Sequence, residues 1–157
     1  MQYWLFKSEP DCYSIDDLKK QGTGMWEGCR NYTVRNFMRD EMQVGDMGFF
    51  YHSNAKPPGI VGTMKVVSTG YPDPTQFDPD SEYFDPKATK ENPRWYLVDV
   101  EFVEKSPEQL TLAQIKEDSV LSGMEVAKKG QMLSITKVTK EQWDRACELL
   151  GDPAKAR

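Results

Sequence analysis

The segment W-E-G-C-R-N-Y-T-V-R-N-F-M-R, residues 26–39, begins with a tryptophan close to a glycine, runs through Arg30-Asn31-Tyr32 and then continues with helical spacing. Val34, Phe37 and Met38 recur on one face, which indicates a helix that packs on a core. A tryptophan followed closely by glycine can lie flat against a planar ligand, because no neighbouring Cβ stands in the way. Two interpretations of Trp26 stay open: the wall of a pocket for a flat polar ligand, or a core residue. Spacing alone favours the core residue.

Segments with strand patterns lie on both sides of this helix. Residues 3–7 are apolar on both faces, which is typical of a strand in the middle of a sheet. Residues 47–52 and 59–67 are predicted to pair as a hairpin with a wide loop. Residues 95–103 alternate between apolar and polar side chains, so one face is expected in the core. Residues 132–138 form a later predicted strand.

Short helices are predicted after Ser14, Thr111 and Thr139, each of which can cap a helix start. Between the strands, residues 70–94 contain five prolines and no regular period, which is typical of a lid or binding loop. Five or six strands with short helices between them predict an α+β fold with a curved or barrel-like sheet. The alternating β-α-β pattern of a doubly wound fold is missing.

The composition predicts one domain over residues 1–157, with a frayed tail at 151–157. Net charge is −5, so a nucleic-acid partner would have to be held by a local site. Three separated cysteines, no signal peptide and no membrane-spanning stretch indicate a reducing compartment. We expect the cytoplasm, with the nucleus open for a eukaryotic source, and we expect no membrane partner.

Catalytic and metal-binding patterns are missing from the sequence. His52 is the only histidine, and no nucleophile elbow accompanies it. No spacing supports a metal site, and no cofactor fingerprint is present. The aspartates of the 70–94 loop, at positions 73, 78, 80 and 85, lie beside or near prolines and are interpreted as turn formers.

Polar residues at two strand ends offer a binding site instead. Lys7 and Ser8 end one predicted strand, and His52, Ser53 and Asn54 end another. Together with the Trp26 segment and its Arg30 and Asn31, these side chains are hypothesised to meet at one rim. A flat wall with varied hydrogen-bond partners would suit an unstacked base and its polar edge. The candidate ligand-binding residues are Trp26, Lys7, Ser8, Arg30, Asn31, His52, Ser53 and Asn54.

Several long motifs in the same order resemble the EVE domain family. They cover nearly the whole chain: Y-W-L-F-K-S-E-P (3–10), W-E-G-C-R-N-Y-T-V-R-N-F-M-R (26–39), F-F-Y-H-S-N (49–54), P-P-G-I-V-G (57–62), Y-P-D-P-T-Q-F-D (71–78) and E-N-P-R-W (91–95). One departure is Cys29, where members more often carry an aliphatic residue. The resemblance implies a PUA-like open barrel related to YTH domains. It also implies a binder of modified bases in DNA or RNA that performs no catalysis.

The order of Lys7-Ser8 and Trp26 is similar to the Lys-Ser and cage tryptophan of YTH domains, which implies a wall role for Trp26 and a polar contact for Ser8. Phe50 or Tyr51 is a candidate to complete an aromatic cage. Phosphate contacts are expected from Arg35, Arg39 and Lys56. We expect a monomer that binds a methylated or hydroxymethylated base.

Two other functions remain open. The acidic net charge also suits a pocket for a free nucleoside-like molecule, with no polymer bound. A hydrolase that uses His52 with a carboxylate is the third interpretation, although no nucleophile arrangement supports it. For the base reader, replacing Trp26 by Ala is expected to remove the preference for the modified base and to leave the fold intact.

Overall fold

The structure, a computed structural model, describes residues 1–151. The expected frayed tail therefore lies, apart from Gly151, outside the described residues. Single turns of 3-10 or π-helix are labelled η. The elements, in chain order, are β1 (Tyr3–Ser8), α1 (Ile15–Gln21), β2 (Thr23–Met25), α2 (Tyr32–Asn36), η1 (Phe37–Glu41), β3 (Met47–His52), β4 (Gly59–Val66), β5 (Tyr71–Pro72), η2 (Pro74–Phe77), β6 (Tyr96–Leu97), β7 (Asp99–Thr111), α3 (Leu112–Glu117), η3 (Leu121–Gly123), η4 (Glu125–Ala127), β8 (Ile135–Val138) and α4 (Lys140–Leu150).

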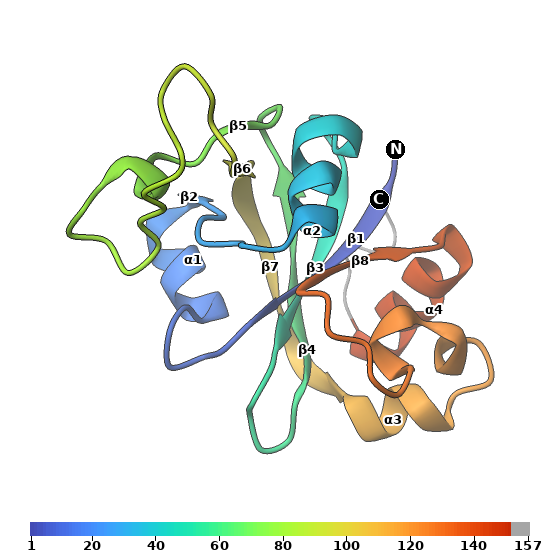
Figure 1. The fold of residues 1–157 in the computed structure, drawn as a ribbon. Coiled ribbons are helices and arrows are strands. Elements are labelled where there is room, and N and C mark those ends of the chain that lie inside the picture. The colour runs from blue at the N-terminus through green and yellow to red at the C-terminus, as the bar shows by residue number, and fades with distance from the viewer. Residues whose placement is uncertain (152–157) are drawn as a thin grey trace.

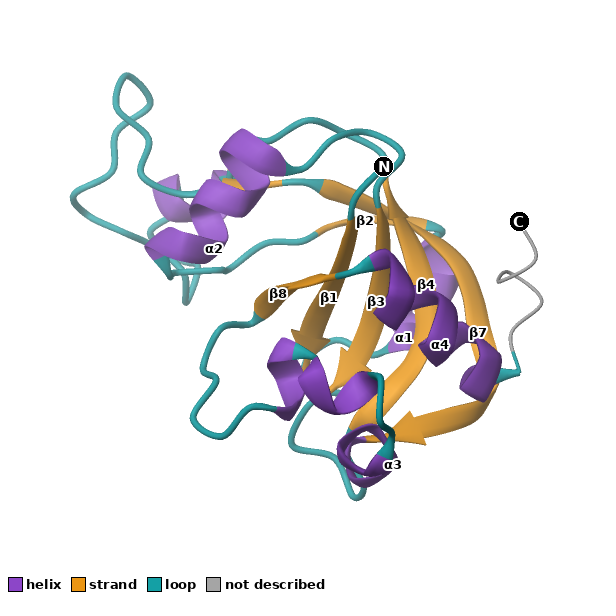
Figure 2. Cartoon of the chain, turned by 90° about the vertical axis from the view of Figure 1, so that its right-hand side faces the viewer, coloured by secondary structure: helices purple, strands orange, loops and turns teal. Residues whose placement is uncertain are grey.

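Six strands of the described chain form one curled sheet in the order β2-β7-β4-β3-β1-β8, and β5 pairs with β6 apart from it. The sheet wraps into a half-barrel (Figures 1 and 2). Register shifts between Phe50 and Tyr51 in β3, and at two places along β4 and β7, mark irregularities that bend the strands. The predicted α+β class with a curved sheet is confirmed.

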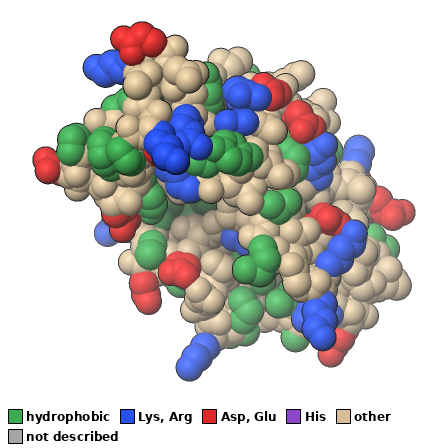
Figure 3. Space-filling view, in the orientation of Figure 1, with side chains coloured by type: hydrophobic (Ala, Val, Ile, Leu, Met, Phe, Trp, Pro, Cys, Tyr) green, Lys and Arg blue, Asp and Glu red, His purple; other side chains and the backbone are tan. Residues whose placement is uncertain are grey.

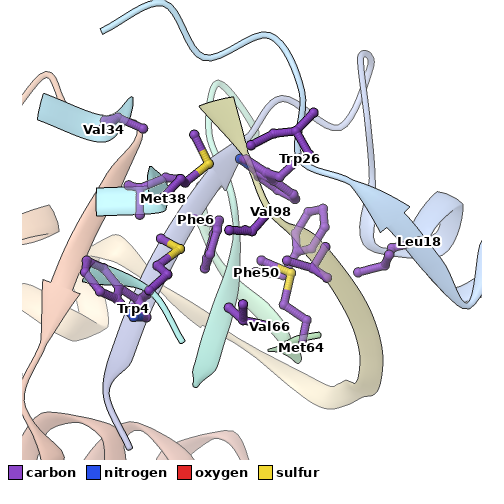
Figure 4. Close-up of a cluster of buried hydrophobic side chains, with 14 of the residues drawn as sticks. Trp4, Phe6, Leu18, Trp26, Val34, Met38, Phe50, Met64, Val66 and Val98 are labelled. Atoms are coloured by element: carbon purple, nitrogen blue, oxygen red, sulfur yellow. The ribbon is translucent and has the colours of Figure 1, made fainter. Parts of the chain in front are cut away.

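Apolar side chains fill two cores, one on each face of the sheet. In β1, Trp4 and Phe6 belong to one core and Leu5 to the other, and all three are fully buried. Successive side chains of a strand point to opposite faces, so a central strand with both faces covered must be apolar throughout. Figure 4 shows the first core, in which Phe6 from β1 lies close to Trp26.

The predicted helix starts are confirmed. Ser14, Thr111 and Thr139 each accept a hydrogen bond from the backbone three residues later, and the side chain at that third position accepts one from the cap's own N–H. These reciprocal pairs are local in sequence, so they satisfy the first free N–H groups whatever the tertiary context.

The helical spacing of Val34, Phe37 and Met38 corresponds to α2, which Asn31 caps by accepting from Val34 N, and to the π-helical turn η1 that follows it. Two details differ from the sequence-based expectations. The strand expected to end at residue 103 continues to Thr111, because its charged second half pairs with β4. β1 and β3 are parallel, with Ser8 opposite His52, although the helices in the chain between them are all short.

The 70–94 loop is organised by its aspartates, as the turn interpretation predicted. Asp73, Asp78 and Asp85 each accept a hydrogen bond from a backbone N–H two residues later, at 2.8–2.9 Å. Asp73 also caps η2 and is fully buried. The loop therefore has defined local structure despite its many prolines.

Candidate functional site

A cleft with a volume of about 1130 Å³ lies beside the end of β1. Its lining residues come from within three segments, residues 7–13, 21–30 and 71–83, together with Asp99 and Ser134. In Figure 3 the molecule is hollowed left of centre, and Lys and Arg side chains gather above the hollow. The cleft is large enough for a nucleoside-sized ligand.

Trp26 lies at the boundary between this cleft and the core. Its backbone N–H donates to Val98 O at 3.0 Å, which ties the segment to the start of β7. The indole is only 6% exposed and meets the rings of Phe6 and Phe50 edge-on, at 5.1 and 5.5 Å between centroids. Trp26 nevertheless lines the cleft. Trp26 is therefore mostly a core residue, and its exposed part contributes to the wall of the cleft.

Lys7 and Ser8 also line the cleft, at the end of β1. The Ser8 hydroxyl donates to Tyr13 O at 2.7 Å, so its proton is already engaged while its oxygen can still accept. Burial lowers the pKa of Lys7, which is half-buried. The first strand therefore brings one hydroxyl and one amine to the cleft.

Arg30 lines the cleft, but its guanidinium is held by the protein. Its two terminal nitrogens donate to Cys29 O, to Asp73 Oδ2 at 3.2 Å, to Thr75 Oγ1 and to Tyr83 O at 2.7 Å. The last three of these bonds join the segment carrying Trp26 to the 70–94 loop. In this arrangement Arg30 acts as a clamp between two walls of the cleft.

Gly28 completes the same junction. Its N–H donates to Asp73 Oδ2 at 2.9 Å, and its φ of +85° lies in the region that favours glycine. A Cβ at this position would approach the Tyr83 ring to 2.6 Å. The ring of the loop tyrosine therefore rests directly on the glycine backbone, which only a residue without a side chain permits.

Four predicted ligand residues are not among those that line the cleft. Asn31 caps α2. His52 accepts from Ile15 N at 3.1 Å through Nε2, so it helps to start α1. Ser53 donates its backbone N–H to Ser8 O at 3.0 Å, and the Asn54 side chain donates to Glu9. The two strand ends do meet, as predicted, because β1 and β3 are parallel neighbours, but only the β1 end faces the cleft.

The three predicted phosphate contacts do not form one surface. Arg35 stacks over Tyr32 at 4.6 Å, and Tyr32 in turn stacks on Trp95. Arg39 pairs with Asp40 at 2.8 Å. Lys56 is exposed in the β3–β4 connection, at the opposite end of the sheet from α2 in Figures 1 and 2.

The aromatic residues that line the cleft with Trp26 are Tyr13, Tyr71 and Tyr83. Neither Phe50 nor Tyr51 lines it: Phe50 is fully buried behind Trp26, and Tyr51 belongs to the core on the other face. The tyrosines come from the connection before α1 and from the 70–94 loop. For Tyr71 and Tyr83, the only indication of this role in the sequence was that the 70–94 loop is rich in aromatic residues.

Within residues 1–151, no group of three or more His, Cys, Asp or Glu side chains is arranged to hold a metal ion. Across the same residues, no helix has both the length and the apolar character needed to cross a membrane.

The EVE domain family model matches residues 2–149, and the chain belongs to this family. Its curled six-stranded sheet with short helices agrees with the PUA-like fold that the resemblance implied. Thymocyte nuclear protein 1 from chicken is 43% identical over 90% of the chain, and the human protein of that name is 41% identical over 90%. The chain spans 66% of the chicken protein and 71% of the human one.

Solved structures give the same relationship. A Pseudomonas syringae protein is 48% identical, with a TM-score of 0.90 over 94% of this chain and 99% of its own. A Leishmania major protein is 44% identical, with a TM-score of 0.91 over 100% and 98%. Human THYN1, in complex with DNA containing 5-methylcytosine, is 40% identical, with a TM-score of 0.88 over 96% and 98%.

Proposed function

We propose that this protein reads a modified base, methylated or hydroxymethylated, in DNA or RNA, and that the base enters the cleft beside Trp26. The observation that carries the proposal is the human THYN1 complex with 5-methylcytosine DNA, from a relative that matches 96% of this chain. The aromatic cleft supports it from the side of this chain, because a base offers a flat π-face to Trp26, Tyr13, Tyr71 and Tyr83.

A base inside a duplex cannot reach such a cleft, so it must be flipped out or already unpaired. Stacking on an aromatic ring contributes about 1–3 kcal/mol per base. Because the Trp26 indole is 6% exposed, it can supply only part of this wall, and the tyrosines supply the rest. Ser8 and Lys7 then contact the polar edge of the base.

Flanking phosphates are proposed to contact Arg35 and Arg39, which are neighbours because both donate to Asn36 Oδ1, whereas Lys56 lies too far from them to join the same contact (Figure 1). Arg35 has no carboxylate partner among the described residues, whereas Arg39 is paired with Asp40. A guanidinium that has no carboxylate partner can bind phosphate without first breaking an ion pair. We therefore expect Arg35 to matter more than Arg39.

The reader is proposed to perform no catalysis. His52 accepts a backbone hydrogen bond from Ile15 and does not line the cleft, so it is poorly placed as a general base for a bound ligand. Turnover of a phosphodiester or glycosidic substrate by the wild type, abolished in His52→Ala, would contradict this part of the proposal.

A second candidate, a pocket for a free nucleoside, is favoured by the acidic side chains that line the cleft, which include Glu9, Glu27 and Glu82. Binding of matched oligonucleotides with and without a modified base, measured at two salt concentrations, separates the two. Polymer binding should weaken steeply with salt, and nucleoside binding should not. Tight, salt-independent binding of the nucleoside, with no preference for a modified oligonucleotide, would replace the first proposal by the second.

A further inference from the structure

Asp99, at the start of β7, presents a half-buried carboxylate to the cleft. Its Oδ1 accepts a hydrogen bond from the Tyr71 hydroxyl at 2.6 Å. None of the ion pairs formed by the described residues includes Asp99, and its Oδ2 has no hydrogen-bond partner there. A partly desolvated carboxylate without a cation is unfavourable unless another group pairs with it.

The backbone on both sides of this pair is fixed. Asp99 N donates to Ser68 Oγ at 2.8 Å, and Asp99 lies opposite Met25 in the β2–β7 ladder. Tyr71 belongs to β5, where it pairs with Leu97 of β6. The carboxylate is therefore held by strands on one side and by a hydroxyl on the other. Such preorganisation is what a specificity contact requires.

The direction of the Tyr71–Asp99 bond determines what Asp99 can recognise. Burial, with the Asp99 hydrogen bond and charge adding to it, raises the pKa of Tyr71 well above its usual range. The tyrosine thus keeps its proton and donates it to Oδ1. The remaining oxygen, Oδ2, can only accept.

An acceptor at this position distinguishes two kinds of base. Cytosine and adenine carry an exocyclic amino group, which donates, whereas thymine and uracil carry a carbonyl oxygen at the corresponding place. A carbonyl facing a carboxylate would leave two acceptors opposed and unpaired. A 5-methyl group does not help to separate them, since thymine and 5-methylcytosine both have one.

We propose that Asp99, oriented by Tyr71, selects bases that carry an exocyclic amino group and rejects those with a carbonyl there. This inference rests on the proposed function of the cleft as a base-binding site. It adds the chemical class of the base, 4-aminopyrimidine or 6-aminopurine, and it names the side chain that reads it.

The test measures binding of the full chain to matched single-stranded oligonucleotides that carry one central variable base. The pyrimidine arm compares 5-methylcytosine with thymine, and the purine arm compares adenine with hypoxanthine, so that neither pair differs by a methyl group. In at least one arm the wild type should prefer the amino base by about tenfold or more, the range expected for a good base-edge contact. The arm in which the preference appears identifies the ring.

Three variants decide whether Asp99 is responsible. Asp99→Asn should lose most of the preference, because a carboxamide can face either group. Tyr71→Phe keeps the aromatic ring and removes the hydroxyl that orients Asp99, so it should lose part of the preference. Glu27→Gln is the matched control, since it removes the same charge from an exposed carboxylate of the same cleft, and it should keep the preference. Thermal unfolding checks that each variant is folded.

The outcomes separate this inference from the proposal on which it rests. No preference for the amino base in either arm, with 5-methylcytosine and thymine both bound more tightly than unmodified cytosine, would keep the methyl reader and overturn the role of Asp99. Equal losses in Asp99→Asn and Glu27→Gln would also overturn it, because the effect would then be one of net charge. Wild-type binding that ignores every modification would overturn both.

Discussion

Arg30 and Asp73 form a salt bridge of 3.2 Å that joins the segment carrying Trp26 to the loop that covers the cleft. Asp73 is fully buried, while the Arg30 side chain is 23% exposed. The same carboxylate accepts from Gly28 N, Thr75 N and Thr75 Oγ1. One side chain thus holds two walls of the cleft in place.

Replacing Asp73 by Ala should lower the free energy of unfolding by about 2–4 kcal/mol, because it removes a buried acceptor and leaves its donors unpaired. Denaturant unfolding measures the change. Asp78→Ala is the control, since Asp78 also forms a turn in this loop but is exposed, and it should cost much less. Similar losses in the two variants would show that Asp73 has no special role.

Gly28→Ala should destabilise the protein more than Gly45→Ala. Both glycines have positive φ, +85° and +98°, so both changes carry the backbone cost, about 1–2 kcal/mol. Only at Gly28 would the new Cβ meet a neighbour, the Tyr83 ring, whereas nothing lies within 4 Å of it at Gly45. The extra loss, about 1–3 kcal/mol by comparison with overpacked cores, is read from paired unfolding curves. Equal losses of unfolding free energy in the two variants would mean that the Tyr83 ring moves aside without cost.

Trp26→Ala should remove most of the preference for a modified base, but the structure changes the expectation that the fold stays intact. With the indole packed against Phe6 and Phe50, the change should cost about 3–5 kcal/mol of stability. Trp26→Phe keeps an aromatic ring and is the variant for binding. Undiminished preference in a folded Trp26→Ala protein would place the reading site elsewhere.

Stability should fall on acidification because of His52. Burial lowers its pKa, Lys105 on β7 lowers it further, and Asp16 on α1 opposes both. Neutral His52 accepts from Ile15 N, so protonation breaks this bond. The folded pKa lies below the unfolded value of about 6.5. The stabilisation that neutral His52 gives to the folded state is therefore fully present above that pH, and it is lost as the pH falls through the folded pKa.

Unfolding free energies measured between pH 8 and pH 5 test this dependence. The variant His52→Gln keeps an acceptor that does not titrate, so its stability should vary less over that range. A wild type and a His52→Gln protein with the same pH profile would contradict the role assigned to His52.

Local patterns predicted much of the fold. The caps at Ser14, Thr111 and Thr139 were readable because both partners of each capping box lie within four residues. The central position of β1 followed from its apolar residues on both faces. The spacing of residues 34–38 also located α2 and η1, although such spacing does not show that the second turn is π-helical.

The site was harder to predict because its contacts are long-range. Arg30 reaches Asp73, 43 residues away, and Tyr71 reaches Asp99, 28 residues away. No spacing rule links such pairs. His52, Ser53 and Asn54 were placed at the site because they end a strand, and the strand does end beside β1. Their side chains are used for α1 and for the connection after β1 instead.

The neighbours of β1 have a consequence for how the protein is made. Tyr3 lies between Met47 of β3 and Val138 of the edge strand β8, so this side of the sheet is completed by a segment about 135 residues further along the chain. During synthesis β1 emerges well before β8, and its outer edge stays open until β8 arrives. Strand pairing between segments so far apart in the sequence slows folding, and it leaves the nascent chain with an unpaired strand edge that is prone to aggregation. A ribosome-bound chain that stops before Ile135 should therefore depend on chaperones far more than the completed domain does.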